Sequence, residues 1–212
     1  KSKGKNFEPY RHEWVSLRLF QAFVSEDSDQ EWLQHLVKVS EKDEAIVLER
    51  LIKDSAITIN NPLSKLPPLA KLVAWLIVSH HKLPVYPVDR AGNPPNYDDI
   101  NQWLDEKFGP LWNSVNSFDD WDEKTRNDNW TFPQGTPFLS KAWRYKAQEL
   151  ATRALSCQRF TGCEWFNQRF TAHLSRLALM LSDHYYSSSP ATIKWQDKHY
   201  QCYANTENDP KT

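Results

Sequence analysis

Glycine and cysteine are scarce in this sequence, and neither sign of charge predominates. The 212 residues include five glycines and three cysteines, and the formal net charge is −1 at pH 7. Few glycines combined with ten tryptophans are typical of a densely packed helical domain and argue against a disordered chain. The balanced charge argues against a protein that holds nucleic acid by bulk electrostatics, although it leaves room for a local basic groove.

The sequence also lacks the segments that mark membrane and secreted proteins. Its longest apolar run, LVAWLIV, is too short to span a bilayer, and the first ten residues contain no apolar core of a signal peptide. The three cysteines form no CxxC pair, so we expect reduced thiols in an intracellular protein. Because the start is polar and basic and has no Met, we expect that the chain begins inside a longer protein.

Helical periodicity dominates the sequence and predicts an all-α fold. We expect helices over residues 12–23, 30–39, 44–53, 68–81, 97–108, 139–157 and 163–186. Residues 174–181 are apolar nearly all round, which predicts that the last helix is central. The region 83–137 holds more than half of the prolines and predicts an irregular excursion over the surface, too long for a simple connector. The polar tail after Pro190 is expected to lead elsewhere.

Two adjacent histidines, His80 and His81, end the most apolar predicted helix. Their spacing from Leu76 and Ile77 continues the apolar face. A buried neutral imidazole needs partners for both ring nitrogens. The pair is therefore either satisfied at a helix C-terminus or a set of metal ligands. Neighbouring positions on a helix point about 100° apart, which suits two different metals or a helix that frays at its end.

Two further residues could complete a metal site. His12 lies at a position of the buried face of the first predicted helix. It is either a metal ligand there or a residue of the first turn that lies near the surface. Asp183 follows an apolar stretch near a helix C-terminus, where the dipole opposes it and partial burial costs about a few kcal/mol. A metal ion, a protonated His184 or Arg176 would offset that cost. Imidazole and carboxylate together suit Mn, Fe, Co, Ni or Zn better than Ca or Mg.

Three stretches in this order, RHEWVSLRLF, AWLIVSHHKLP and LMLSDHYYSS, resemble the HD-type nuclease domain of the CRISPR-associated nuclease–helicases, most closely the type I-F form. In that form a module like the adaptation nuclease, the HD domain and a helicase share one polypeptide. The resemblance covers essentially the whole chain. It implies a portion of an HD-domain-like helical bundle, with 83–137 as an insertion and the tail 190–212 leading toward the helicase.

The resemblance also implies an activity. By motif, it makes His12, His80, His81 and Asp183 ligands of two divalent transition-metal ions, with Mn, Fe, Co or Ni favoured. The implied reaction is hydrolysis of DNA phosphodiesters, preferably in single strands, during CRISPR interference in antiviral defence. The implied partners are single-stranded DNA, the crRNA-guided surveillance complex and the CRISPR adaptation nuclease, in the prokaryotic cytoplasm and without a membrane. ATP would serve only a helicase part outside this chain, which has no GxxxxGK[ST] motif.

One departure from the family is large, because the sequence contains no His-Asp dipeptide. In the family that pair precedes the lone histidine that His12 matches. We therefore expect the missing ligands upstream of Lys1, and we expect this chain to carry only part of the metal site and not to cleave DNA alone. A less favoured explanation is a degenerate, non-catalytic relative.

A basic, aromatic helix could form a wall for single-stranded DNA. Its candidate residues are Lys141, Arg144, Lys146 and Arg153, interleaved with Trp143 and Tyr145. The same pattern also fits a solvated helix face with a core tryptophan. Two other functions remain open from the sequence: an HD phosphohydrolase that acts on nucleotides, and a non-catalytic helical scaffold.

Overall fold

The computed structural model describes residues 10–54, 62–83, 108–112, 122–133, 135–157 and 168–188. These residues form helices and contain no strand, which confirms the all-α prediction. The elements are α1 (His12–Val24), α2 (Asp29–Val37), α3 (Asp43–Arg50), α4 (Pro68–Ser79), α6 (Glu123–Asp128), the 3-10 helix η2 (Pro137–Leu139), α7 (Lys141–Ser156) and α8 (Arg169–Ser188). Most of the helix predicted over 97–108 lies outside the described residues. In the described part of the chain, no helix is both long and apolar enough to cross a bilayer.

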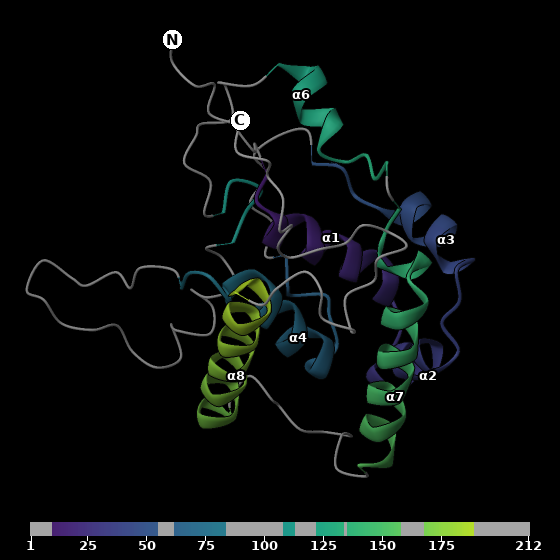
Figure 1. Ribbon diagram of the computed structural model, residues 1–212, viewed down its shortest axis with the longest axis vertical. Helices are drawn as coiled ribbons and strands as arrows, with labels where there is room; N and C mark the ends of the chain where they lie inside the picture. The colour runs from purple at the N-terminus through teal and green to yellow at the C-terminus, as the bar shows by residue number, and fades with distance from the viewer. Residues whose placement is uncertain are drawn as a thin grey trace, which may run out of the picture.

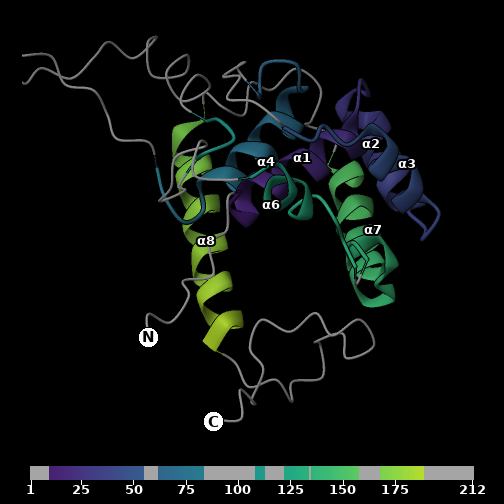
Figure 2. The ribbon, with the colours of Figure 1, turned by 90° about the horizontal axis from the view of Figure 1, so that it is seen from above.

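Helices α1 and α4 cross the middle of the molecule. α1 packs against α4 and α3, and α2 packs against α7. In both views α7 and α8 lie on opposite sides of this central pair (Figures 1 and 2). One core cluster surrounds Trp14 of α1 and Trp75 of α4, and a second surrounds Phe23 and Trp32. The end of α1 that carries His12 belongs to the first cluster.

The starts of α2 and α4 are set by polar side chains that satisfy free backbone N–H groups. Ser28 and Glu31 form a capping box at the start of α2. Asp29 then reaches across to α4, where its carboxylate accepts hydrogen bonds from the N–H groups of Leu69 and Ala70 at 2.8 and 2.9 Å. A carboxylate also complements the positive end of the helix dipole. The start of α4 is therefore fixed to α2.

Helix α4 ends at Ser79, two residues earlier than the sequence predicts. His80 is the C-cap, and His81 lies in the bend that follows. The prediction that both histidines continue the apolar face of the helix is therefore wrong. The free carbonyls of the last turn are taken by side chains, which makes this end stable. Trp112 Nε1 donates to the Val78 carbonyl at 2.8 Å, and Arg176 Nε donates to the Ser79 carbonyl at 2.8 Å.

The described parts of the Pro-rich region contribute to the core. Phe108, Pro110 and Trp130 are buried, and Phe108 and Trp130 belong to the cluster around Trp14. The expected excursion over the surface does not hold for these residues, because their large apolar side chains gain more from burial than from exposure. The short helix α6, capped by Asp122, was also not predicted from the sequence.

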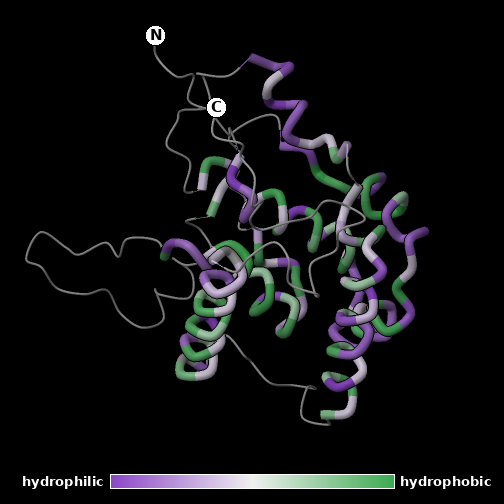
Figure 3. Tube along the Cα trace, viewed as in Figure 1, coloured by the Kyte–Doolittle hydropathy of each residue, from purple (hydrophilic) through white to green (hydrophobic). Residues whose placement is uncertain are grey.

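Helix α8 is not central, contrary to the prediction. Leu174, Leu177 and Leu181 are 52%, 51% and 61% exposed, and of the α8 side chains that the structure describes only Ala172 is buried. Hydrophobic positions run along much of this helix in Figure 3. Among the described elements α8 packs chiefly against α4. One neighbour covers one face of a helix, so the remaining apolar positions stay exposed.

Candidate metal centre

Three imidazoles meet where the start of α1 lies beside the end of α4. His12 is the first residue of α1, and His80 and His81 follow the last residue of α4. Each ring offers a nitrogen, and these ligand atoms all lie within 4.8 Å of one another. The Nε2 atoms of His12 and His81 are 3.1 Å apart. The ring centroids of His80 and His81 are 4.0 Å apart, and they lie 5.6 and 5.0 Å from the ring of His12, in tilted and edge-on orientations.

This arrangement fits a bound transition-metal ion. For nitrogen–metal bonds of about 2.1 Å, the 3.1 Å separation of the two Nε2 atoms corresponds to an angle of about 95° at the ion. Neutral imidazole nitrogens suit Zn, Cu, Fe and Ni, and hard ions such as Mg and Ca prefer oxygen. The side chain of His12 is 57% exposed, and His81 is exposed. Such a site leaves coordination positions open to solvent or to a substrate.

One of the three imidazoles is oriented by a hydrogen bond through its other ring nitrogen. The Nδ1 atom of His80 lies 2.7 Å from the carbonyl oxygen of Ile77, so Nδ1 carries the proton and Nε2 is left as a ligand. The Nδ1 atom of His12 lies 3.5 Å from the Glu13 carboxylate, which is an electrostatic contact longer than a hydrogen bond. Ligand histidines commonly donate their second N–H to a carbonyl, as His80 does, or to a carboxylate.

The electrostatics of the cluster favour the neutral form of one imidazole. Partial desolvation by its neighbours lowers the pKa of His81, although the residue is exposed overall. The neighbouring His80 and His12 lower this pKa further, against the opposing effect of the Glu13 and Asp183 carboxylates. A neutral imidazole has the lone pair that a metal requires. The effect of Asp183 on this pKa shows that its carboxylate lies within electrostatic range of His81.

Asp183 is half-buried on α8 and does not belong to the group of ligand atoms within 4.8 Å. Of the two residues considered as its alternative partners, His184 is exposed. The other, Arg176, donates hydrogen bonds to the carbonyls of Ser79 and His80, at 2.8 and 3.4 Å. Arg176 therefore holds α8 against the residues that carry the histidine pair.

Two residues of this neighbourhood had no assigned part in the site at the level of sequence. Glu13 has no part in the sequence prediction of the metal site, although its position next to His12 was a usable signal. Arg176 was considered only as a counter-ion for Asp183. Its contact with carbonyls 96 and 97 residues away has no sequence signature, because it depends on how α8 packs against α4.

The basic residues proposed as a DNA wall lie on α7, which packs against α2 and η2. Arg144 donates to the Phe138 carbonyl, and Lys146 forms a 2.8 Å ion pair with Glu149. Lys141 and Arg153 are exposed. The cationic surface available to a DNA strand on this helix therefore comprises Lys141, Arg153 and the exposed Lys146, whose surface ion pair with Glu149 is weak.

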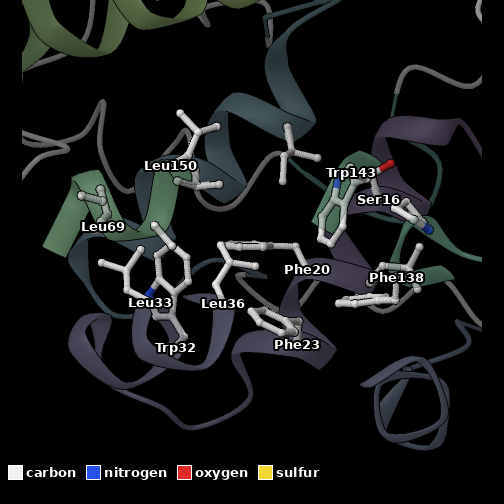
Figure 4. A pocket seen from close by; sticks show the side chains of 16 residues that line it. Ser16, Phe20, Phe23, Trp32, Leu33, Leu36, Leu69, Phe138, Trp143 and Leu150 are labelled. Carbon is white, nitrogen blue, oxygen red and sulfur yellow. The ribbon is translucent and has the colours of Figure 1, made fainter. Parts of the chain in front are cut away.

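A cavity of about 530 Å³ lies between α1, α2, α4 and α7. Phe20, Phe23, Trp32, Phe138 and Trp143 point into it (Figure 4). None of the side chains that line it is acidic, basic or a histidine. A hydrolytic centre needs ligands or proton-transfer groups, so this cavity is not a second candidate for the chemistry. Trp143 borders this apolar cavity but is 37% exposed, so it is not a core tryptophan.

Two curated proteins are similar in sequence to this chain. The chain is 46% identical over 209 residues to "CRISPR-associated nuclease/helicase Cas3 subtype I-F/YPEST" of Pectobacterium atrosepticum, which is 96% of this chain and 19% of that protein. It is 37% identical over 217 residues to the protein of the same name from Pseudomonas aeruginosa, again covering 19% of it.

No family model matches the chain. The two curated relatives nevertheless match nearly all of it, and they confirm the resemblance drawn from the three sequence stretches. The chain spans about a fifth of the length of these relatives (19% of each). Over nearly its whole length, this chain is therefore a relative of one portion of the Cas3 nuclease/helicases of subtype I-F/YPEST.

Proposed function

We propose that this chain is part of a metal-dependent nuclease that hydrolyses phosphodiester bonds of single-stranded DNA in CRISPR interference. The observation that carries the proposal is the convergence of His12, His80 and His81, with two Nε2 atoms 3.1 Å apart. The names of the relatives, nuclease/helicase, support the reaction class.

The proposed ligands are His12, His80, His81 and Asp183. Bound there, divalent ions of Mn, Fe, Co or Ni supply charge stabilisation for phosphodiester hydrolysis and lower the pKa of a water molecule. One ligand nitrogen of each imidazole lies within 4.8 Å of those of the other two, and in this proposal Asp183 adds negative charge from α8. None of these residues serves as a general base in this proposal. A two-metal centre also needs the His-Asp ligands that this sequence lacks, and their position upstream of Lys1 stays a prediction.

The exposure of the site favours a polymer over a small nucleotide. His12 and His81 are exposed, so a strand could pass across the cluster, whereas a nucleotide phosphohydrolase would be expected to enclose its substrate in a pocket. In our proposal Lys141 and Arg153 of α7 contact phosphates of the strand at a distance from the cluster. The surveillance complex, the adaptation nuclease and an ATP-driven helicase part remain proposed partners of the complete protein.

The test is made on the complete protein that contains this chain. Metal content and cleavage of a single-stranded oligonucleotide are compared between the wild type and a His80→Ala, His81→Ala double variant. The control is His173→Ala, which removes an exposed histidine of α8 that stacks edge-on against Trp75. We expect the double variant to lose metal and cleavage while its circular dichroism is unchanged, and the control to keep both.

Three outcomes would contradict the proposal in different ways. Metal binding without cleavage of DNA, but with release of phosphate from deoxynucleotides, would support the phosphohydrolase. A wild type that binds no metal and is inert would support the scaffold. An active wild type whose double variant cleaves equally well would show that the histidines are not ligands.

A further inference from the structure

A carboxylate of α1 is fully buried immediately beside an exposed ligand histidine. Glu13 is 0% exposed, whereas the side chain of its neighbour His12 is 57% exposed. The Oε2 atom of Glu13 lies 3.5 Å from His12 Nδ1 and 3.6 Å from Arg11 Nε. Burying a charged carboxylate is costly unless specific partners compensate it, so this position requires an explanation.

Helix electrostatics account for only part of that explanation. Glu13 lies in the first turn of α1, where the dipole and Arg11 favour a negative charge. A surface carboxylate would obtain the same benefit without the cost of burial. The burial brings Oε2 to the Nδ1 edge of His12, on the opposite side of the ring from the Nε2 atom that faces His81.

The two ends of a helix explain why a side chain is needed here. The free backbone groups at a helix C-terminus are carbonyls, and at an N-terminus they are N–H groups. His80 stands at the end of α4 and uses the Ile77 carbonyl for its Nδ1 proton. His12 stands at the start of α1, where the free backbone groups are donors. The protein acceptor that α1 offers beside its Nδ1 is therefore a side chain, the Glu13 carboxylate, whose Oε2 lies 3.5 Å away.

We propose that Glu13 is a positioning residue of the metal centre, which accepts the Nδ1 proton of His12 and so directs Nε2 toward the position shared with His81. The proposal rests on the proposed function, because it assumes that these histidines bind metal. Carboxylate–histidine–metal arrangements fix the tautomer and orientation of the ring and raise the basicity of the ligand. Glu13 itself contacts neither metal nor substrate in this role.

The experiment measures metal affinity in the complete protein with Co²⁺ as the probe. The dissociation constant is obtained by competition with a chelator, and the visible absorption of bound Co²⁺ reports its ligand set. Glu13→Leu keeps a similar volume and removes the acceptor, and Glu13→Gln keeps an acceptor oxygen without the charge. The matched control is Asp43→Asn, because Asp43 is also a buried carboxylate that pairs with a histidine, at 2.9 Å from His35 Nε2, away from the cluster.

We expect Co²⁺ binding to weaken by about 10–100-fold in Glu13→Leu, the range found when such outer hydrogen-bond partners of a metal ligand are removed, with a changed absorption spectrum. Glu13→Gln should fall between Glu13→Leu and the wild type, and it carries the test if Glu13→Leu does not fold. Asp43→Asn should bind Co²⁺ as the wild type does, even if its melting temperature falls.

The inference is overturned if both Glu13 variants bind Co²⁺ with the affinity and spectrum of the wild type, because Glu13 would then serve only the fold. It is also overturned if Asp43→Asn loses affinity to the same extent, because the loss would then follow general destabilisation. A wild type that binds no Co²⁺ would instead contradict the proposed function, so the two failures are distinguishable.

Discussion

The guanidinium of Arg176 joins α8 to the end of α4 at the point where the histidine pair begins. Its Nε donates to the Ser79 carbonyl at 2.8 Å, and its Nη2 lies 3.4 Å from the His80 carbonyl. Ser79 is fully buried, so water cannot readily replace the donor at its carbonyl. We predict that Arg176→Met, which keeps the aliphatic stem and removes the guanidinium, loosens α8 and weakens the metal centre.

The magnitude follows from the two contacts. A hydrogen bond from a charged donor contributes about 1.5–3 kcal/mol net. The contact with His80 exceeds the usual range of about 2.7–3.2 Å and adds little. We therefore expect the opening of α8 from α4 to become easier by about 1.5–3 kcal/mol. Where exchange follows local opening, backbone amides of α8 should then exchange hydrogen for deuterium about 10–150-fold faster.

Hydrogen–deuterium exchange with mass spectrometry measures the opening of α8 locally in the complete protein. The control is Arg50→Met, which removes an exposed arginine from the last turn of α3 and should leave α8 unchanged. Co²⁺ affinity is measured on the same samples and should fall in Arg176→Met, because the His80 backbone and Asp183 both lose their support. Unchanged exchange in α8 would refute the anchoring contact. Faster exchange with unchanged affinity would refute its link to the metal centre.

Three other predictions address stability and DNA binding. Burial would raise the pKa of the Asp43 carboxyl, but hydrogen bonds from Ser40 and His35 outweigh it and lower the pKa below its ordinary value of 3.8. The stability from this ionised group is therefore complete above that value and is lost as the pH falls through the lower pKa of the folded state. Acid unfolding monitored by tryptophan fluorescence should be steeper below about pH 4 in the wild type than in Asp43→Asn, and equal slopes would contradict the assignment. Gly135→Ala should lower the free energy of unfolding in urea by about 1–3 kcal/mol. The glycine has a φ of 82°, and a Cβ would collide with the Leu139 side chain. A variant as stable as the wild type would argue against this backbone conformation. Replacing Lys141 and Arg153 together should weaken the binding of single-stranded DNA. The slope of log K against the logarithm of the salt concentration should fall in magnitude by about 0.7 for each phosphate that the protein no longer neutralises. An unchanged slope would exclude these residues of α7 from the DNA path.

The sequence predicted correctly those helices that have an apolar pattern on one face and pack through that face. α1 and α7 begin and end within about two residues of their expected bounds. The prediction that α8 is central was wrong, because an apolar pattern all round a helix indicates burial only if neighbours are available on every side. Among the described elements α4 is its main neighbour, and no feature of residues 174–181 themselves reports that. The prediction of a surface excursion was wrong for Phe108 and Trp130 for the opposite reason. Prolines near them suggested a surface loop, but the size of their own side chains favoured the core.

The sequence singled out the residues of the candidate site but not their arrangement. The histidines of the two separate stretches were chosen by chemistry, and the structure brings all three within reach of one position. The contribution of Asp183 depends on where α8 sits, and the sequence carried no signal for the Arg176 contact that sets it. Long-range contacts of this kind depend on packing between elements, whereas residue type and spacing report only local preference.

The end of α4 determines what surrounds the two adjacent histidines. His80 keeps helical backbone angles (φ −62°, ψ −34°), and His81 lies in the bend that follows. The rings of His80 and His81 lie 4.0 Å apart, with their candidate ligand atoms near that of His12. The end of the helix frees the carbonyls that hold the arrangement, since Ile77 orients His80, Val78 receives Trp112, and Ser79 receives Arg176. Ending the helix therefore supplies the carbonyl acceptors that hold His80, Trp112 and Arg176 at this end of α4.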